Sequence, residues 1–347
     1  MQFKRLLKYA GKYKKYLLLC PLVMIGEVVM EMLLPLITAR LIDEAIPACQ
    51  ATGSLRQVIV LGAAMLVMAC VSMAFGMAGS RLAALGGMGF ARNLRQAIFE
   101  KVQHFSFKNI DHFSTASLVT RLTTDVNQTQ NVVMMLVRMA VRSPIQFILA
   151  FFMAARMNAS LLPVLAVAVP LLLVGAGIIM SKAFPRFQIM MKKYDALNAS
   201  VQENLIAIRV VKAFVRAAHE KEKFNASADD VTATQRAAEK IVLWNSPMMQ
   251  ILVYGCIVSV LWLGGQQVIG GTMEIGALSS FISYITQILM SLMMLSFLLV
   301  SFVMARASVA RICEVLDEEP DIVSPAHAEE KVQDGSIVFD HVGFSYS

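Results

Sequence analysis

The chain has 347 residues, of which 57% are hydrophobic and 16% are charged, and its mean hydropathy is +0.63. Soluble domains are roughly 45–50% apolar and about 25% charged, so this composition argues against a soluble enzyme. The net charge of +7 is expected to lie in cytoplasmic segments of a membrane protein, and it is a poor indication of a nucleic-acid surface. The five cysteines form no CxxC pair, which disfavours a disulfide framework or a zinc site.

The first 16 residues are basic and amphipathic. Residues 1–15 hold six Lys or Arg and no acid, and they alternate with apolar residues such as Leu6 and Leu7. This pattern predicts an interfacial helix over residues 1–16 that leads into the membrane. The alternative is an ordinary positive flank with no separate helix.

Six apolar stretches follow, each long enough to cross a bilayer, which takes about 20 residues. Charge interrupts the first (Glu27 and Glu31) and the third (Arg138 and Arg142). The first stretch has no small-residue cleavage site and is too long for a signal peptide, so it is interpreted as a retained helix. The six are Tyr16–Ala39, Gln57–Ser80, Arg138–Ala155, Met157–Ser181, Ile241–Met273 and Ile275–Ala305.

The links between the spans differ in length and charge. Residues 81–142 and 182–240 are long, rich in Lys and Arg and composed of good helix formers. The positive-inside rule places them and both termini in the cytoplasm. Each is expected to be a helical hairpin that continues its flanking spans by roughly 40 Å, at 1.5 Å per residue.

The tail changes character after residue 318. Residues 319–335 are polar and typical of a linker, and residues 336–347 alternate as a β-strand does, with Ile337 and Phe339 on one face. A strand does not stand alone. We therefore expect residues 336–347 to begin a soluble domain that the chain does not contain.

Four groups of motifs lie in order on this hydropathy frame, and together they resemble the transmembrane half of an ATP-binding cassette (ABC) exporter. The motif sequences are most similar to those of bacterial multidrug-type half-transporters, which are often one half of a heterodimer. The resemblance implies that the chain stops at the start of the nucleotide-binding domain. Ala207 stands where that family usually has glycine, and no GxxxxGK[ST] phosphate loop is present. The motifs are 110–113 with 117–126, 201–214 with 222–224, 271–278 before Tyr284, and 306–317 with 338–346.

The resemblance implies an all-α membrane domain of six helices over residues 17–318, with two cytoplasmic hairpins. It implies export of amphipathic or hydrophobic compounds by alternating access, in a bacterial plasma membrane, with a second half-transporter as partner. ATP and Mg²⁺ would be used by the full-length protein, and this chain alone would bind no cofactor and catalyse no reaction. The alternatives are a lipid or peptide exporter of the same fold, or a non-pumping channel or regulator.

The resemblance also implies that each hairpin tip docks on a nucleotide-binding domain. In the first tip, Asp111 is available as a helix cap and the apolar side chains are available for docking. The structural alternative is that these are hairpin turns that pack on neighbouring stalks. Tyr346 matches the family's adenine-stacking residue, which would act only in the full-length protein. The tip candidates are Asn109, Ile110, Asp111, His112, Phe113, Glu203, Arg209, Val211, Lys212 and Phe214.

Two further sets are candidates for a substrate cavity. Glu27 and Glu31 are four residues apart and so share one helix face. They either attract cationic cargo or pair with Arg138 or Arg142, and the sequence leaves both open. Flexible, polarizable methionines on the sixth span suit variable apolar cargo, and the alternative is that they face lipid or fill the core. These are Met290, Met293 and Met294.

Overall fold

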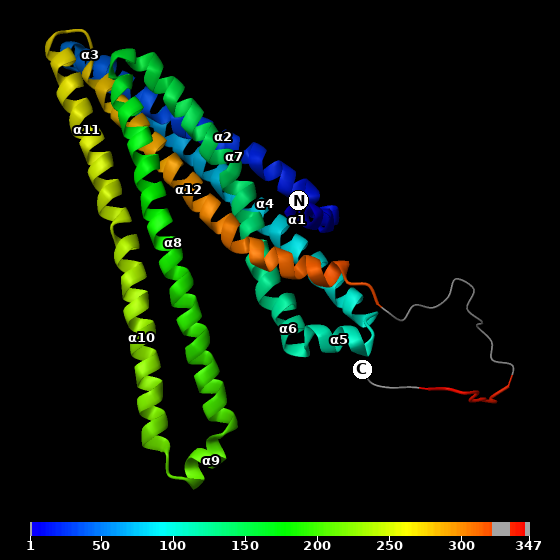
Figure 1. The fold of residues 1–347 in the computed structure, drawn as a ribbon. Helices are drawn as coiled ribbons and strands as arrows, with labels where there is room; N and C mark the ends of the chain where they lie inside the picture. The colour runs from blue at the N-terminus through cyan, green and yellow to red at the C-terminus, as the bar shows by residue number, and fades with distance from the viewer. Residues whose placement is uncertain (1, 321–333, 344–347) are drawn as a thin grey trace. The chain divides into compact units, whose positions relative to one another are not determined.

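The computed structural model describes residues 2–320 and 334–343. Its described residues form six helical stretches that are long and apolar enough to cross a membrane, which confirms the expected all-α fold with six spans (Figure 1). The stretches are Leu7–Thr52, Arg56–Gln103, Thr115–Met157, Ala159–Ile206, Ala217–Ile269 and Ile275–Asp317. The protein is therefore a multi-pass membrane protein.

Short 3₁₀ or π segments begin or interrupt three of these stretches, and a turn at Trp244 divides a fourth. In chain order the elements are α1 (Gln2–Leu6), η1 (Leu7–Tyr13), α2 (Lys14–Arg40), η2 (Leu41–Ala45), α3 (Ile46–Thr52), α4 (Arg56–Gln103), α5 (Phe107–Phe113), α6 (Thr115–Thr120), η3 (Arg121–Asp125), α7 (Val126–Met157), η4 (Ala159–Leu161), α8 (Leu162–Ile206), α9 (Ile208–Ala213), α10 (Ala217–Leu243), α11 (Asn245–Ile269) and α12 (Ile275–Asp317).

The chain divides into two compact units. The span unit comprises Tyr16–Ala84 and Met135–Val300. The three-segment unit comprises the described residues within Met1–Lys15, Leu85–Met134 and Ser301–Ser347. Helices α2, α4, α7 and α12 contribute residues to both units.

The core of the span unit lies where α2, α7, α8, α11 and α12 meet. Phe281, Tyr284 and Leu172 are fully buried in it. The Tyr284 hydroxyl donates to the Met32 carbonyl at 2.8 Å, and the Ser280 hydroxyl donates to the Pro35 carbonyl. These bonds give buried hydroxyls the partners that they need in an apolar medium, and they fix α12 against α2.

The start of α12 is capped by a side chain from another element. The Asp43 carboxylate of η2 accepts from the Gly276 N–H at 2.6 Å and from the Ala277 N–H at 3.1 Å, two of the donors that a helix start leaves unpaired. A Cβ on Gly276 would lie 2.5 Å from the Ala39 carbonyl oxygen, so the close approach requires glycine. The negative charge of nearby Asp43, followed by a hydrogen bond to it, raises the pKa of Glu274.

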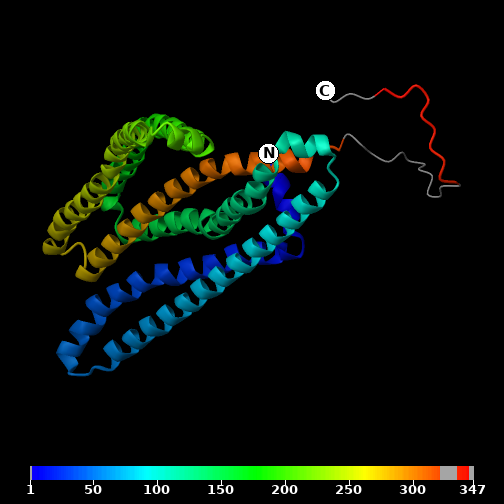
Figure 2. The same cartoon turned by 90° about the horizontal axis from the view of Figure 1, so that it is seen from below.

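Helices α8 and α10 run side by side and are joined at their ends by α9 (Figures 1 and 2). Lys193 and Asp230 form an ion pair across them at 2.5 Å, and the Tyr194 hydroxyl bonds to Gln235 at 3.0 Å. Within residues 182–240 the structure thus forms a helical hairpin. Its first arm is the C-terminal part of α8, which runs without a break from the preceding span.

The N-terminal segment is two short helical pieces in the three-segment unit and not one continuous helix. Gly11 interrupts η1 with φ +50° and ψ −129°, a conformation that side chains rarely adopt. The Asn93 side chain donates to the Tyr9 carbonyl at 2.9 Å on the approach to this break. Leu6 and Ala10 are buried, so the apolar side of this segment packs against protein.

Gly89 of α4 makes room for the Tyr13 ring. A Cβ on Gly89 would lie 2.2 Å from the ring's Cγ, so the whole ring would have to move and not only the end of a flexible side chain. Replacing Gly89 with alanine is therefore expected to displace Tyr13 and lower the midpoint of thermal unfolding. Gly62→Ala on the same helix, where nothing lies within 4 Å, is the matched control. It is expected to stabilise by up to about 1 kcal/mol through helix propensity, and equal midpoints for the two variants would contradict the packing argument.

Residues 334–343 form no strand, and all of them are exposed. The strand that the alternation of residues 336–347 predicts is therefore not formed within the described part of this segment, where no second strand is present to pair with it. Tyr346 lies outside the described residues.

Candidate functional site

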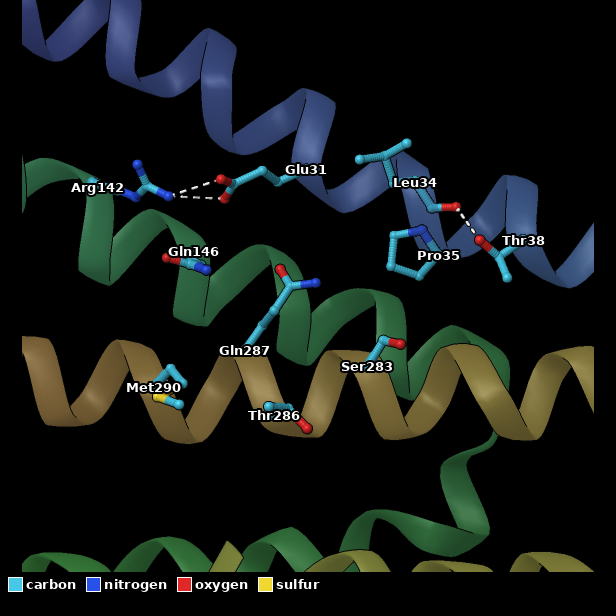
Figure 3. Close-up of a pocket in the computed structure, with 10 residues that line it drawn as sticks. All are labelled: Glu31, Leu34, Pro35, Thr38, Arg142, Gln146, Ser283, Thr286, Gln287 and Met290. Atoms are coloured by element: carbon cyan, nitrogen blue, oxygen red, sulfur yellow. Dashed lines mark hydrogen bonds and ion pairs between the residues drawn. The ribbon is translucent and has the colours of Figure 1, made fainter. Parts of the chain in front are cut away.

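A cavity of about 460 Å³ lies among α2, α7 and α12 of the span unit (Figure 3). Its residues recur every three or four positions along each helix, so each helix turns one stripe toward the same space. Seven of the ten lining residues are polar or charged, and Leu34, Pro35 and Met290 supply apolar wall. The lining residues are Glu31, Leu34, Pro35, Thr38, Arg142, Gln146, Ser283, Thr286, Gln287 and Met290.

Two carboxylates share one guanidinium at one end of the cavity. Arg142 Nη1 donates to Glu27 Oε1 at 2.6 Å, and Arg142 Nη2 donates to Glu31 Oε1 and Oε2 at 2.8 and 3.0 Å (Figure 3 draws the Glu31 contacts). Glu27 fits closely against α4, because a Cβ on Gly76 would lie 3.1 Å from Glu27 Oε1. Of the two arginines offered by the sequence, the structure pairs Arg142 with both acids. Arg138 makes no ion pair with any residue that the structure describes.

The three candidate methionines have different surroundings. Met290 lines the cavity, Met293 packs against the buried core, and Met294 is exposed outside the cavity lining. The cavity amides Gln146 and Gln287 were not among the sequence candidates. Helical spacing could have indicated them, because Gln146 lies one turn after the candidate Arg142 and Gln287 lies one turn before the candidate Met290.

A second polar cluster holds the three-segment unit together. Asp125 is fully buried, and its carboxylate accepts two hydrogen bonds from Arg311, one of them from Nε at 2.8 Å. Arg121 is also buried and reaches the Arg311 carbonyl and the Glu314 carboxylate, each at 2.8 Å. Asp125 and Arg311 belong to two of the motifs that suggested the resemblance, so these motifs meet in space.

The end of α12 is held from two sides. Arg5 forms an ion pair with Asp317 at 2.5 Å, and this hydrogen bond and charge raise the pKa of Arg5. Asn109 of α5 donates to Glu318 at 2.7 Å. The first candidate tip is thus tied to the residues that lead toward the C-terminal tail.

The first tip, α5, differs from the sequence expectation in two ways. Its cap is Ser106, in a reciprocal capping box with Asn109, and not Asp111, which lies too far into the helix to accept first-turn N–H groups. Phe113 is 4% exposed and packs under the guanidinium of Arg121, 4.7 Å from the ring centre, so it is not an exposed docking side chain. Phe107 is 87% exposed and was not among the candidates. Ile110 is half-buried, and His112 is exposed.

The second tip, α9, presents apolar side chains beside basic ones. Phe214 is 73% exposed, Arg209 and Lys212 are exposed, and Val211 is half-buried. Glu203 pairs with Lys223 across the hairpin at 3.3 Å. Val211 also lines a groove of about 310 Å³ between α8, α9 and α10.

Residues 17–292 match the family model described as the ABC transporter transmembrane region. The chain belongs to this family. It is 32% identical over 325 residues to the uncharacterized ABC transporter ATP-binding protein YfiB of Bacillus subtilis, covering 94% of this chain and 56% of that protein. It is 31% identical over 318 residues to the uncharacterized ABC transporter ATP-binding protein Rv1273c of Mycobacterium tuberculosis, covering 90% and 53%.

One more distant relative has a name that states its substrate. The chain is 26% identical over 253 residues to the fatty acid ABC transporter ATP-binding/permease protein of Mycobacterium bovis, covering 73% of this chain and 40% of that protein. The chain thus spans about half the length of the curated relatives that it matches. As an ABC transmembrane domain, it contains no nucleotide-binding fold within residues 2–320 and 334–343.

Proposed function

We propose that this transmembrane domain is one half of an ATP-driven exporter, and that with a partner half it forms an alternating-access pathway for amphipathic or hydrophobic compounds of the multidrug type. The observation that carries the proposal is the cavity of Figure 3, where polar groups from three spans share one space inside an apolar bundle. Ionisable groups at membrane depth are costly and usually mark a substrate path. The apolar wall beside them suits an amphipathic molecule.

The proposal includes a motor that this chain does not contain. In the full-length protein, ATP and Mg²⁺ bind to nucleotide-binding domains, with Tyr346 stacking on adenine. Tips α5 and α9 dock on these domains, and their closure switches the cavity from inward- to outward-facing. The partner half is identical or related. The excess of Lys and Arg in residues 81–142 and 182–240 supports cytoplasmic tips and termini, in the plasma membrane of a bacterium.

A lipid exporter of the same fold is the second candidate, because one relative is named as a fatty acid transporter. A non-pumping channel or regulator is the third. The three differ in what drives flux and in which cargo moves.

The deciding experiment measures uptake of a panel of fluorescent amphiphiles into inside-out vesicles that contain the assembled full-length transporter. Uptake that requires ATP and ceases when hydrolysis is blocked with vanadate is the expected result. Downhill flux without ATP would establish a channel and refute the pump. Strong preference for acyl lipids over all other probes would establish the lipid exporter.

A further inference from the structure

The cavity of Figure 3 carries one surplus negative charge. Glu27 and Glu31 are both bound to Arg142, and no other cation pairs with them among the residues that the structure describes. Two carboxylates against one guanidinium leave a formal charge of −1. A negative site in a low-dielectric bundle attracts cations and repels carboxylates.

Glu31, more than Glu27, presents this charge to the cavity. The Glu27 side chain is 12% exposed and does not line the cavity, whereas that of Glu31 is 29% exposed and does. Glu27 Oε2 is buried with no hydrogen-bond partner among the described residues, so Glu27 depends on Arg142 for compensation. Glu31 is therefore the acid that can exchange a contact with Arg142 for a contact with cargo.

The neutral lining offers hydrogen-bond acceptors. The hydroxyls of Thr38, Ser283 and Thr286 each donate their one proton to a carbonyl of their own helix, at 3.0, 3.2 and 2.9 Å. Their oxygens can then only accept from a ligand. Gln287 Oε1 is buried and has no partner among the described residues. The cavity thus offers a ligand four acceptor oxygens, beside the amide donors of Gln146 and Gln287 and Arg142 Nε, which is buried with no partner among the described residues.

The same lining does not suit a quaternary ammonium group. Of the ten described residues around the cavity, none is aromatic, so cation–π contact with a methylated nitrogen is not provided. A head that carries both positive charge and N–H bonds would satisfy Glu31 and the free acceptors together.

We propose that this cavity binds the protonated primary amine head of an amphipathic cargo, with Glu31 as its counter-ion and Gln287 and the helix hydroxyls as its acceptors. The inference rests on the proposed export function and specifies its substrate class. The apolar tail of the cargo would lie against the apolar part of the lining, which is Leu34, Pro35 and Met290.

The test uses a fluorescent naphthylalkyl tail with four alternative heads: primary ammonium, trimethylammonium, hydroxyl and carboxylate. ATP-dependent uptake and probe-stimulated ATP hydrolysis are measured for the full-length transporter in inside-out vesicles. The primary ammonium probe is expected to half-saturate uptake at a concentration roughly tenfold below the other three, because its hydrogen bonds are charge-assisted.

The variants separate cavity charge from general structure. Glu31→Gln and Glu27→Gln each cancel the surplus charge, so each is expected to bring the ammonium and hydroxyl probes to similar half-saturation. Glu27→Gln combined with Arg142→Gln removes the internal pair but leaves Glu31, and it is expected to retain the ammonium preference. Glu44→Gln, which changes an exposed acid outside the cavity, is the matched control and keeps the wild-type preference.

Each outcome bears on one of the two proposals. Absence of ATP-dependent uptake for all four probes would refute the export function itself. Uptake without ammonium preference, or a preference that survives Glu31→Gln, would overturn the inference and leave export standing. Equal uptake of the trimethylammonium probe would show that charge alone, without N–H donors, selects the cargo. Preference for the carboxylate would overturn the argument from charge.

Discussion

Replacing Arg311 with methionine is expected to destabilise the protein by roughly 2 kcal/mol, less than for a fully buried pair, because Asp125 is buried but the Arg311 side chain is 47% exposed. The reason is the fully buried Asp125 carboxylate, which would lose two hydrogen bonds and the cation that pairs with it. The measurement is the midpoint of thermal unfolding of the purified full-length protein.

Arg306→Met is the matched control for this prediction. Arg306 lies on the same helix and is exposed, so its loss should cost little. Adding Asp125→Asn to the Arg311 variant removes the uncompensated charge and should recover part of the lost stability. If the Arg311 and Arg306 variants unfold at the same midpoint, the Asp125–Arg311 pair does not stabilise the three-segment unit.

Replacing Phe214 with aspartate is expected to uncouple transport from ATP hydrolysis in the full-length protein. Phe214 is 73% exposed at tip α9, and a charge there should prevent its insertion into an apolar groove. We expect ATP-dependent uptake to fall at least tenfold, which corresponds to about 1.4 kcal/mol of docking free energy, while hydrolysis continues. Both rates are measured in the same vesicles.

Phe214→Leu preserves an apolar side chain and should retain most of the uptake. Phe107→Asp makes the same test at tip α5. If Phe214→Asp leaves uptake unchanged, the docking role of α9 is refuted. A fall in thermal stability together with both rates would favour the alternative in which the tip packs on neighbouring stalks.

The six spans could be predicted because bilayer thickness demands long apolar runs, and few other structures use them. The ion pairs inside the spans could not be predicted from the sequence. Arg138 and Arg142 lie one turn apart, so either could meet Glu27 and Glu31 on sequence grounds. Only the rotation of α7 about its axis, which packing of the whole helix determines, brings Arg142 to both acids.

The tips show the same limit at shorter range. Phe107 and Phe113 stand at the two ends of one seven-residue helix, and nothing in their spacing says which is exposed. Arg121, eight residues after Phe113 along the chain, covers the Phe113 ring, so Phe113 is the buried one of the two. The cap was decided by position, since Ser106 precedes the helix whereas Asp111 lies within it.

The separation of Asp125 from Arg311 along the chain has a consequence for biogenesis. The arginine emerges from the ribosome 186 residues after the acid that it neutralises. At bacterial and eukaryotic elongation rates of about 5–20 residues per second, that delay is roughly ten to forty seconds. Until then the Asp125 carboxylate lacks this partner, so the three-segment unit can close around it only after α12 has been synthesised.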